Sequence, residues 1–280
     1  MNYFSAYNKK KTDKLFAQMS CYYKESSSYY EDIAFTNCNW SDNQLLPYQR
    51  ILGEIAGKNI LELGCGNASV LSVVKEHGVK SYTGADFSGD LIRTNRISYP
   101  FARFEVLNND GRFIGNEKTY DVVFSVFVLE HCIRPFEFLL DCSRFCRDEG
   151  KVIIFCPDFY VRGLISSQLL GTSNGSGREK LRKGRLIDAL STGWVAKYAS
   201  PSLIRRKLTK AHQTPVFLLN GNPACFSRPF YPDADAVYVT YEKEIEAFMT
   251  TLGCRRIQND IDITNFCRKK RLLYMEFEKK

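Results

Sequence analysis

The sequence predicts an α/β fold built around a parallel β-sheet, and three observations lead to this prediction. Short β-rich runs alternate with helical patterns from residue 59 to residue 158, as in strands that are joined by crossover helices. The runs are almost continuously hydrophobic, which is expected where helices cover both faces of a sheet. Polar turns that contain glycine or acidic residues follow the first three runs, at the end of the strand where such sheets bind ligands.

Five strands and several helix boundaries follow from these patterns. Ser88, after the second strand, suits a helix N-cap, and Pro135 suits the first turn of a helix. Before the first strand, Ser41 or Asp42 can cap a helix that runs to Ile55. The predicted strands span residues 59–63, 81–85, 103–107, 120–127 and 151–156.

The C-terminal part is predicted to form a helix followed by two strands. Residues 241–252 have the pattern of an amphipathic helix, and Gly253 is suited to end it. Residues 254–263 and 271–278 are β-rich and are predicted to be strands.

A long basic insertion separates the fifth strand from this C-terminal part. Residues 159–235 are too many for an ordinary connection in an α/β unit, so we expect an insertion with its own helices. Between Phe159 and Pro215 there are eleven Lys and Arg but only two acidic residues, an excess of +9 in a chain whose net charge is +8. A positive surface of this kind attracts anionic ligands, although a solvated helix face is the simpler interpretation.

The composition indicates a globular protein without a membrane span or a metal site. Apolar residues make up 44% and charged residues 25% of the 280. No apolar run approaches the roughly 20 residues that cross a bilayer, and the start lacks the apolar core of a signal peptide, so we expect a cytoplasmic protein. The ten cysteines are scattered and there are only three histidines, without the spacing of metal ligands.

The most specific local signal is the turn after the first strand, Glu62-Leu63-Gly64-Cys65-Gly66-Asn67-Ala68. Its two glycines let the backbone turn tightly and approach a ligand, while the start of the next helix points amide groups toward it. Paired glycines also occur in strand-to-helix turns with a purely structural role, so this turn alone does not define a binding site.

Acidic residues end the next two strands. Asp86 lies twenty residues beyond Gly66, where a carboxylate can accept hydrogen bonds from both hydroxyls of an adenosine ribose. Asn109-Asp110-Gly111 closes the third strand, where the Asp110 carboxylate can accept a hydrogen bond from an adenine amino group. A dinucleotide-binding fold would place a third glycine at position 69, which is Ser69, and usually an apolar residue in place of Glu62.

In this order the segments resemble the motifs of class I S-adenosylmethionine-dependent methyltransferases, in particular the small-molecule branch. The resemblance covers residues 59–157 well and residues 236–280 less specifically, where a Val-Tyr-Val-Thr run is similar to a late strand of the family. Ala68 stands where the family often has a third glycine, and it is small enough to allow cofactor binding. The resemblance rests on Glu62 to Gly66, Asp86, Asn109-Asp110, Tyr120 to Val123 and Val128-Leu129-Glu130-His131.

The resemblance implies a Rossmann-like fold and an S-adenosylmethionine cofactor. The expected sheet has seven mostly parallel strands, with the last strand antiparallel and helices on both faces. The two glycines would lie beneath the methionine part of the cofactor, the carboxylate at position 86 at the ribose and the one at position 110 near the adenine. The expected cofactor-binding residues are Glu62, Gly64, Cys65, Gly66, Asp86, Phe87, Asn109, Asp110, Gly111, Val126 and Phe127.

The same resemblance suggests four parts of the chain. Residues 1–57 would form an N-terminal helical cover, and residues 58–158 the cofactor-binding core. Residues 159–235 would form a basic lid or substrate insertion, and residues 236–280 would complete the core sheet with a helix and two strands.

Methyl transfer from a sulfonium depends mainly on alignment, so few catalytic side chains are needed. If the acceptor is a hydroxyl, His131 at the mouth of the fourth strand is the candidate general base, with Glu130 as a second candidate. His131 can instead serve only to orient the loop, and Asp158 is a further candidate just beyond the fifth strand. The basic insertion favours an anionic acceptor, such as a phosphorylated, nucleotide-linked or sugar-type metabolite.

Two alternatives remain open at this point. The basic segment with interleaved aromatic residues also suits RNA, although the chain shows no recognisable RNA-binding module. A protein methyltransferase, or a catalytically inactive protein that binds the cofactor, would carry the same cofactor motifs. The sequence does not indicate the oligomeric state.

Overall fold

The computed structural model describes residues 3–25, 46–73, 78–108, 110–161, 164–165, 177–198, 214–226 and 234–280. The chain divides into two compact units, each described here by itself. The sheet unit consists of residues 27–129, 136–156 and 249–280. The insertion unit consists of residues 1–26, 130–135 and 157–248.

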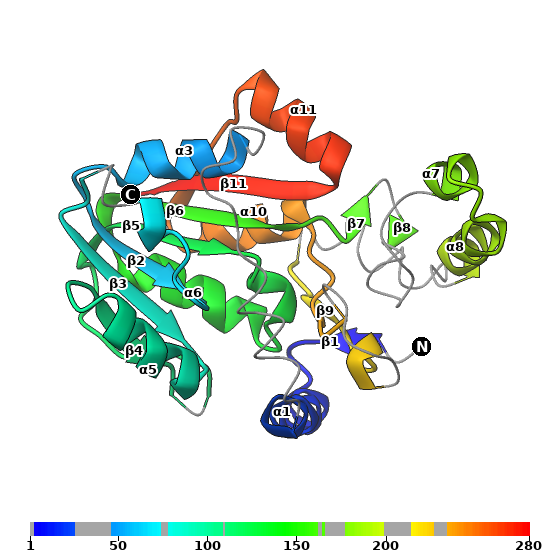
Figure 1. The fold of residues 1–280 in the computed structure, drawn as a ribbon, viewed down its shortest axis with the longest axis horizontal. Coiled ribbons are helices and arrows are strands. Elements are labelled where there is room, and N and C mark those ends of the chain that lie inside the picture. Colours follow the sequence, from blue (N-terminus) through cyan, green and yellow to red (C-terminus); the bar gives the residue numbers. More distant parts are fainter. Residues whose placement is uncertain are drawn as a thin grey trace. The chain divides into compact units, whose positions relative to one another are not determined.

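A seven-stranded sheet forms the centre of the sheet unit, in the order β10-β11-β6-β5-β2-β3-β4 (Figure 1). β2 pairs in parallel with both β3 and β5, β3 with β4, and β5 with β6, whereas β10 and β11 are antiparallel. This confirms the predicted α/β fold with a mostly parallel sheet and an antiparallel C-terminal strand. The strands are β2 (Asn59–Leu63), β3 (Ser81–Asp86), β4 (Arg103–Val106), β5 (Tyr120–Val126), β6 (Cys146–Pro157), β10 (Cys254–Ile257) and β11 (Leu272–Lys279).

The helices of the sheet begin and end largely where the sequence predicts. The Oγ atom of Ser88 accepts a hydrogen bond from the Leu91 N–H at 3.3 Å, which confirms Ser88 as an N-cap, and α6 begins at Pro135. The predicted caps Ser41 and Asp42 lie outside the described residues. The helices are α3 (Leu46–Ile55), α5 (Gly89–Ser98), α6 (Pro135–Phe145) and α11 (Ile261–Lys270). A further helix, α10 (Glu242–Thr251), has its residues up to Phe248 in the insertion unit.

The prediction that residues 254–263 form a single strand is wrong. β10 ends at Ile257, and α11 follows because the Asp260 carboxylate accepts a hydrogen bond from the Ile263 N–H at 2.8 Å and caps the helix. The alternation of Ile261 and Ile263 with aspartates looks like a strand, but the buried residues of the helix are Ile263 and Cys267, four positions apart. The C-terminal order is therefore helix, strand, helix, strand.

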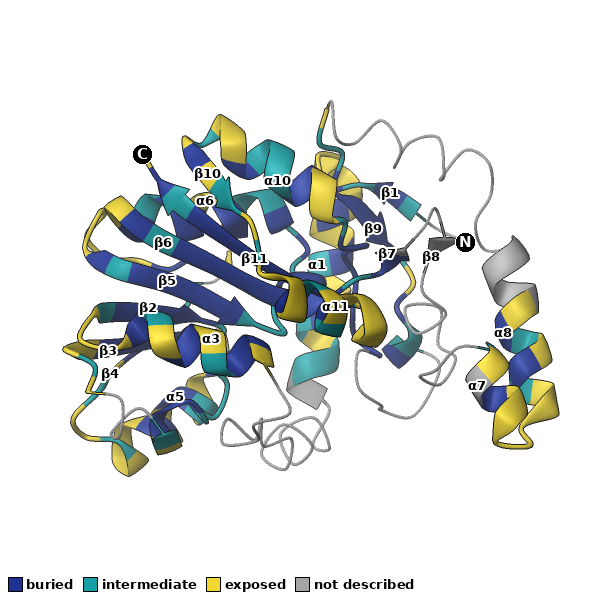
Figure 2. Ribbon diagram, turned by 90° about the horizontal axis from the view of Figure 1, so that it is seen from above, coloured by how far each residue is buried: buried dark blue, intermediate teal, exposed yellow. Residues whose placement is uncertain are grey.

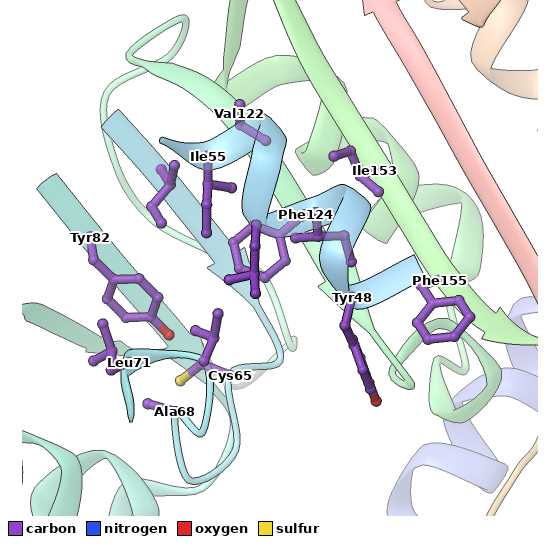
Figure 3. Packing of buried hydrophobic residues seen from close by; sticks show 14 of the residues in the cluster. Tyr48, Ile55, Cys65, Ala68, Leu71, Tyr82, Val122, Phe124, Ile153 and Phe155 are labelled. Carbon is purple, nitrogen blue, oxygen red and sulfur yellow. The ribbon is translucent and has the colours of Figure 1, made fainter. Parts of the chain in front are cut away.

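A hydrophobic cluster holds α3 against the sheet (Figure 3). The Tyr48 ring meets the Phe155 ring edge to face, with centroids 5.5 Å apart, and Ile55 is completely buried. Cys65 and Tyr82 belong to the same cluster. Each fully buried aliphatic or aromatic side chain contributes about 1.5–3 kcal/mol, so this cluster fixes the strands whose ends carry the predicted site.

The insertion unit combines segments from distant parts of the sequence. β1 (Tyr3–Ser5) pairs antiparallel with β9 (Leu218–Asn220), and β7 (Tyr160–Val161) pairs with β8 (Leu164–Ile165). Figure 2 shows both exposed and buried residues on α7 and α8, the two helices of residues 177–198. The helices of the unit are α1 (Lys9–Glu25), α7 (Gly177–Arg182) and α8 (Leu186–Tyr198), with short 3-10 turns η1 (Leu129–His131) and η2 (Ala224–Phe226).

The Val-Tyr-Val-Thr run, residues 237–240, does not form the predicted late strand of the large sheet. Tyr238 makes an isolated antiparallel bridge to Leu219 of β9, and the Val239 N–H donates to the Leu218 carbonyl at 2.9 Å. The run pairs here because the short strand β9 offers its backbone groups, while β10 and β11 complete the large sheet.

Candidate functional site

The glycine turn after β2 requires left-handed backbone conformations. Gly64 has φ +79° and Gly66 has φ +50°, and Ala68 has φ +52° where the resembling family often has glycine. A Cβ atom on Gly64 would lie 2.3 Å from Val128 Cγ2, whereas one on Gly66 would meet none of the described residues within 4 Å. Gly64 is therefore needed for packing, and the turn is open above Gly66.

Asp86 holds this turn from the end of β3. Its side chain is buried, and its two carboxylate oxygens accept backbone N–H groups of Gly66 and Ser88, each at 2.9 Å. Burial raises the pKa of Asp86, and the hydrogen bonds from the backbone oppose that rise. The Asn95 side-chain amide donates to the Gly66 carbonyl at 2.7 Å, so both polar groups of Gly66 are held.

A buried acidic group supports the turn from below. Tyr82 donates its hydroxyl to Glu62 Oε2, and burial raises the pKa of Glu62 to about 8. Burial likewise raises the pKa of the Cys65 thiol, and the nearby charge of Asp86 adds to this effect. The sequence predicts that Glu62 binds the cofactor. The structure shows in addition its hydrogen bond with the buried Tyr82, which the sequence pattern does not reveal.

The loop after β4 is fastened to α6. The Asn108 Oδ1 atom accepts the N–H groups of Asp110 at 3.0 Å and Arg112 at 2.8 Å, and Gly111 has φ +75°. The Arg112 guanidinium binds both carboxylate oxygens of Asp141, one of them at 2.5 Å. The ion pair ties the loop to α6. Asp110 is exposed and follows β4, so it lies at the same edge of the sheet as Asp86, because β3 and β4 are parallel.

The other predicted cofactor residues lie at the ends of β3 and β5. The Phe87 side chain is 45% exposed, which is unusual for a phenylalanine beside a buried strand end. Phe127 has φ +55°, donates its N–H to the Phe155 carbonyl at 2.8 Å and packs its ring on Phe155. Val126 ends β5 and is half-buried, and Asn109 lies outside the described residues.

His131 and Glu130 belong to the insertion unit, where they meet residues that the sequence does not single out. His131 Nδ1 lies 3.2 Å from Asp235 Oδ1, and His131 Nε2 lies 3.7 Å from Glu130 Oε1. Asp235 Oδ2 accepts a hydrogen bond from the Tyr23 hydroxyl at 2.8 Å. Sequence reasoning missed Asp235 and Tyr23, since they are separated by 212 positions and carry no motif.

Asp158 and the basic insertion give less to the candidate site. Asp158 Oδ1 accepts the Tyr160 N–H at 3.2 Å in a local turn. Lys180, one of the basic residues, is buried and donates to Thr192 Oγ1 at 2.7 Å, so it is part of the α7–α8 packing. Arg162 and the basic residues between positions 205 and 210 lie outside the described residues.

In the described ranges, no three His, Cys, Asp or Glu side chains gather as a metal-binding group. Across the same ranges, every helix is too short or too polar to cross a bilayer.

The strand order and the turn define a class of fold. The order of strands reverses at β2, with β3 on one side and β5 on the other, and open α/β sheets bind ligands outside the carboxyl ends at such a point. The glycine turn follows β2, Asp86 ends β3, and the Asp110 loop follows β4, the strand on the other side of β3. The sheet unit therefore has a Rossmann-like fold.

Comparison with known proteins identifies the family of this domain. Residues 61–154 match the family model described as "Methyltransferase domain". The chain is 30% identical over 101 residues to a ubiquinone biosynthesis O-methyltransferase of Maricaulis maris, which is 35% of this chain and 39% of that protein. Residues 61–154 are thus similar to the methyltransferase family, which agrees with the resemblance to class I S-adenosylmethionine-dependent methyltransferases and with the cofactor inferred from the motifs.

Further relatives extend over more of the chain. A tRNA U34 carboxymethyltransferase of Methylococcus capsulatus is 24% identical over 206 residues, 68% of this chain and 55% of that protein. The chain thus spans about half the length of the curated relatives it matches. The PH0226 protein of Pyrococcus horikoshii has the same fold, with a TM-score of 0.51 and 14% identity, over 91% of this chain and 100% of that one.

Proposed function

We propose that this chain transfers a methyl group from S-adenosylmethionine to a small anionic metabolite, with oxygen as the acceptor atom. The observation that carries the proposal is the Gly66 turn, which is open on one side and held on the other by Asp86 and Asn95. A ligand with an amino-acid end and a ribose fits a site of this kind, because backbone can approach it closely beside a carboxylate.

The described residues can hold the parts of such a cofactor. The Asp86 carboxylate already accepts two N–H groups but has capacity for further hydrogen bonds, so it can accept from ribose hydroxyls. The exposed Phe87 ring offers a flat apolar surface for the adenine, and Asp110 offers an acceptor for its amino group. We propose that the other residues predicted from the sequence also line the cofactor site: Glu62, Gly64, Cys65, Gly66, Asn109, Gly111, Val126 and Phe127.

When bound, the cofactor supplies an electrophilic methyl group: an acceptor lone pair forms the bond to its carbon while sulfur keeps the electron pair of the broken bond. His131 would take the proton that a hydroxyl acceptor loses, and Glu130 would stabilise the resulting positive charge. The +9 excess of charge between Phe159 and Pro215 supports an anionic acceptor, because it would raise the local concentration of such a molecule.

Titration calorimetry tests the proposal directly. We expect heat with both S-adenosylmethionine and its demethylated product, and transfer of a labelled methyl group to an acidic fraction of a metabolite extract. Binding without transfer to any fraction would indicate an inactive cofactor-binding protein. The absence of heat with either nucleoside, for a folded protein, would refute the proposal.

An RNA substrate is the second candidate, favoured by the relation to the tRNA U34 carboxymethyltransferase over 68% of this chain. RNA binding depends steeply on salt, because neutralised phosphates release counterions. If affinity for a tRNA pool falls by roughly 10³-fold or more between 50 and 200 mM salt and labelled methyl groups enter the tRNA, the RNA assignment replaces the small-molecule one.

A further inference from the structure

We propose that Asp235 and Tyr23 are positioning residues for His131, and that together they set the orientation and proton affinity of its imidazole ring. The inference rests on the proposed function for its catalytic meaning. Its structural basis lies wholly within the insertion unit, where all three residues are found.

The contacts form a chain of three side chains. His131 Nδ1 faces Asp235 Oδ1 at 3.2 Å, and the other oxygen of Asp235 accepts the Tyr23 hydroxyl at 2.8 Å. The Asp235 side chain is 4% exposed, whereas that of His131 is 26% exposed. The carboxylate is thus enclosed and the imidazole can still be reached, which is the arrangement that a base and its orienting group require.

The main chain holds the two ends of this arrangement together. The Glu130 carbonyl, next to His131, accepts the N–H groups of Val237 at 2.8 Å and Tyr238 at 2.9 Å. On the other side of Asp235, the Ala234 carbonyl accepts the Cys225 N–H at 2.9 Å. Asp235 therefore stands on a segment whose backbone is tied to the His131 turn.

Tyr23 is held in its turn by aromatic packing. The rings of Tyr22 and Tyr23 meet at 5.5 Å, and Tyr22 meets Phe226 of η2 at 6.5 Å. The Tyr23 hydroxyl is therefore aimed at Asp235 from α1 by contacts that do not involve His131.

The charges around the imidazole favour its protonated form once a proton arrives. Glu130 is completely buried, with Oε1 3.7 Å from His131 Nε2. Burial raises the pKa of Asp235, but the charge of His131 and the hydrogen bonds from His131 and Tyr23 outweigh burial, so the net pKa is lowered. Asp235 thus stays ionised beside the ring.

Two cysteine thiols and one ion pair belong to the same unit. Burial raises the pKa of Cys225 to about 12, with a contribution from Asp235, and burial raises the pKa of Cys132, with a contribution from Glu130. Arg134 pairs with Asp13 at 3.1 Å. Neither thiol ionises near neutral pH, so neither adds a charge beside the ring.

These contacts assign each group a part in the proton step. Asp235 accepts from Nδ1–H, so that Nε2 carries the lone pair that takes the proton of an acceptor hydroxyl. The O–H electron pair stays on the acceptor oxygen as it bonds to the methyl carbon, and the imidazolium later returns its proton to solvent. Asp235 and Tyr23 act only through His131, which makes them positioning rather than catalytic residues.

Nitrogen-15 NMR of the imidazole side chains tests this inference without an acceptor. The chain has only three histidines, so the signals of His131 can be assigned with a His131→Gln variant. In Asp235→Asn we expect the titration midpoint of His131 to move to lower pH by about 1–3 units, because a paired negative charge is lost. Tyr23→Phe should move the midpoint in the opposite direction and by less, since it removes a donor that shares the charge of Asp235.

A matched carboxylate serves as the control. Asp13 is in the same unit, also pairs with a cation and is 46% exposed, so Asp13→Asn should leave the His131 signals unchanged. Unchanged signals of His131 in both Asp235→Asn and Tyr23→Phe would overturn the inference. If Asp235→Asn does not fold, as judged by circular dichroism, the Tyr23→Phe result decides.

The activity arm separates this inference from the proposed function. With labelled cofactor and the anionic fraction of an extract, Asp235→Asn should lower the transfer rate by about 10²-fold or more, while the Kd of the cofactor changes by less than about twofold. A wild-type protein that binds no cofactor would refute the proposed function and leave the NMR result to stand. A transfer rate in Asp235→Asn that equals the wild type would overturn the positioning role even if the midpoint moves.

Discussion

The sheet unit and the insertion unit each contain a buried aspartate, and the groups that contact its carboxylate differ between them. Asp86 accepts hydrogen bonds from backbone N–H groups of Gly66 and Ser88, whereas Asp235 accepts one from the Tyr23 side chain and lies 3.2 Å from His131 Nδ1. Backbone donors follow from the fold itself, since any residue provides them. Side-chain donors have to be present at particular positions, so the first site follows from local sequence and the second from a long-range arrangement.

The difference also has an energetic side. A carboxylate held by backbone groups keeps its environment when neighbouring side chains change, while one that is held by other side chains is altered by single substitutions. The sheet unit should therefore be sensitive at glycines and at the aspartate itself, and the insertion unit at every member of its chain of contacts.

The largest change in the free energy of unfolding is expected at Gly64, in the glycine turn of the sheet unit. Gly64→Ala places a Cβ atom 2.3 Å from Val128 Cγ2 at φ +79°, and overpacking together with backbone strain should cost about 2–5 kcal/mol. Gly53 is the matched control, because a Cβ there, in the last turn of α3, meets none of the described residues within 4 Å. Urea denaturation should show that Gly53→Ala is stabilised by up to about 1 kcal/mol, and equal stability of the two variants would contradict the expectation.

The next effect concerns the cofactor. Asp86→Ala removes the acceptor of two buried N–H groups and the proposed ribose contact, so the Kd of S-adenosylmethionine should rise about 100-fold. Asp90, four residues further on and 63% exposed in its pair with Arg93, provides the control variant Asp90→Asn. Calorimetry that finds the same affinity in both variants would remove Asp86 from the proposed site.

The contribution of Glu62 to the stability of the sheet unit should depend on pH. Burial raises its pKa from 4.5 to about 8, so its contribution to stability is complete below pH 4.5 and is lost as the pH rises through 8. Relative to Glu62→Gln, the wild type should lose on the order of a few kcal/mol between these limits. Denaturation at several pH values measures this, with Glu105→Gln on β4, 34% exposed, as the control that should follow the wild type.

A smaller effect is expected where the loop after β4 is fastened to α6. Asp141→Asn weakens the pair with Arg112 and loosens the loop that carries Asp110, so the Kd of the cofactor should rise by about fivefold, or about 1 kcal/mol. Asp148→Asn breaks an exposed pair with Lys118 at 2.8 Å and should leave the Kd unchanged. A loop that needs no support from α6 would give the same Kd in both.

The fold of the sheet unit could be predicted because its signals are local. Hydrophobic runs such as Asn59–Leu63 mark buried parallel strands, and Ser88 and Pro135 mark helix starts. The prediction failed at Ile261, where two isoleucines alternate with aspartates and look like a strand. The Asp260 cap overrides that pattern, and the burial of Ile263 and Cys267 follows the helical period.

For the candidate site, only the places of some residues in the fold could be predicted. Asp86 and Asp110 could be placed from the strand ends alone, but the hydrogen bond from Asn95 to Gly66 could not, because nothing in the sequence links positions 29 apart. Asp235 was missed for a stronger form of the same reason. Its partners come from α1 and η1, and only the tertiary structure brings them together.

The grip on both polar groups of Gly66 has a consequence for how a ligand is received. A turn that is already immobilised by Asp86 and Asn95 has little conformational entropy left to lose when a molecule settles on it. Such a turn should show slow amide hydrogen exchange at Gly66 even in ligand-free protein. The turn would thus be preorganised: its conformational entropy is lost when the protein folds and not each time a ligand binds.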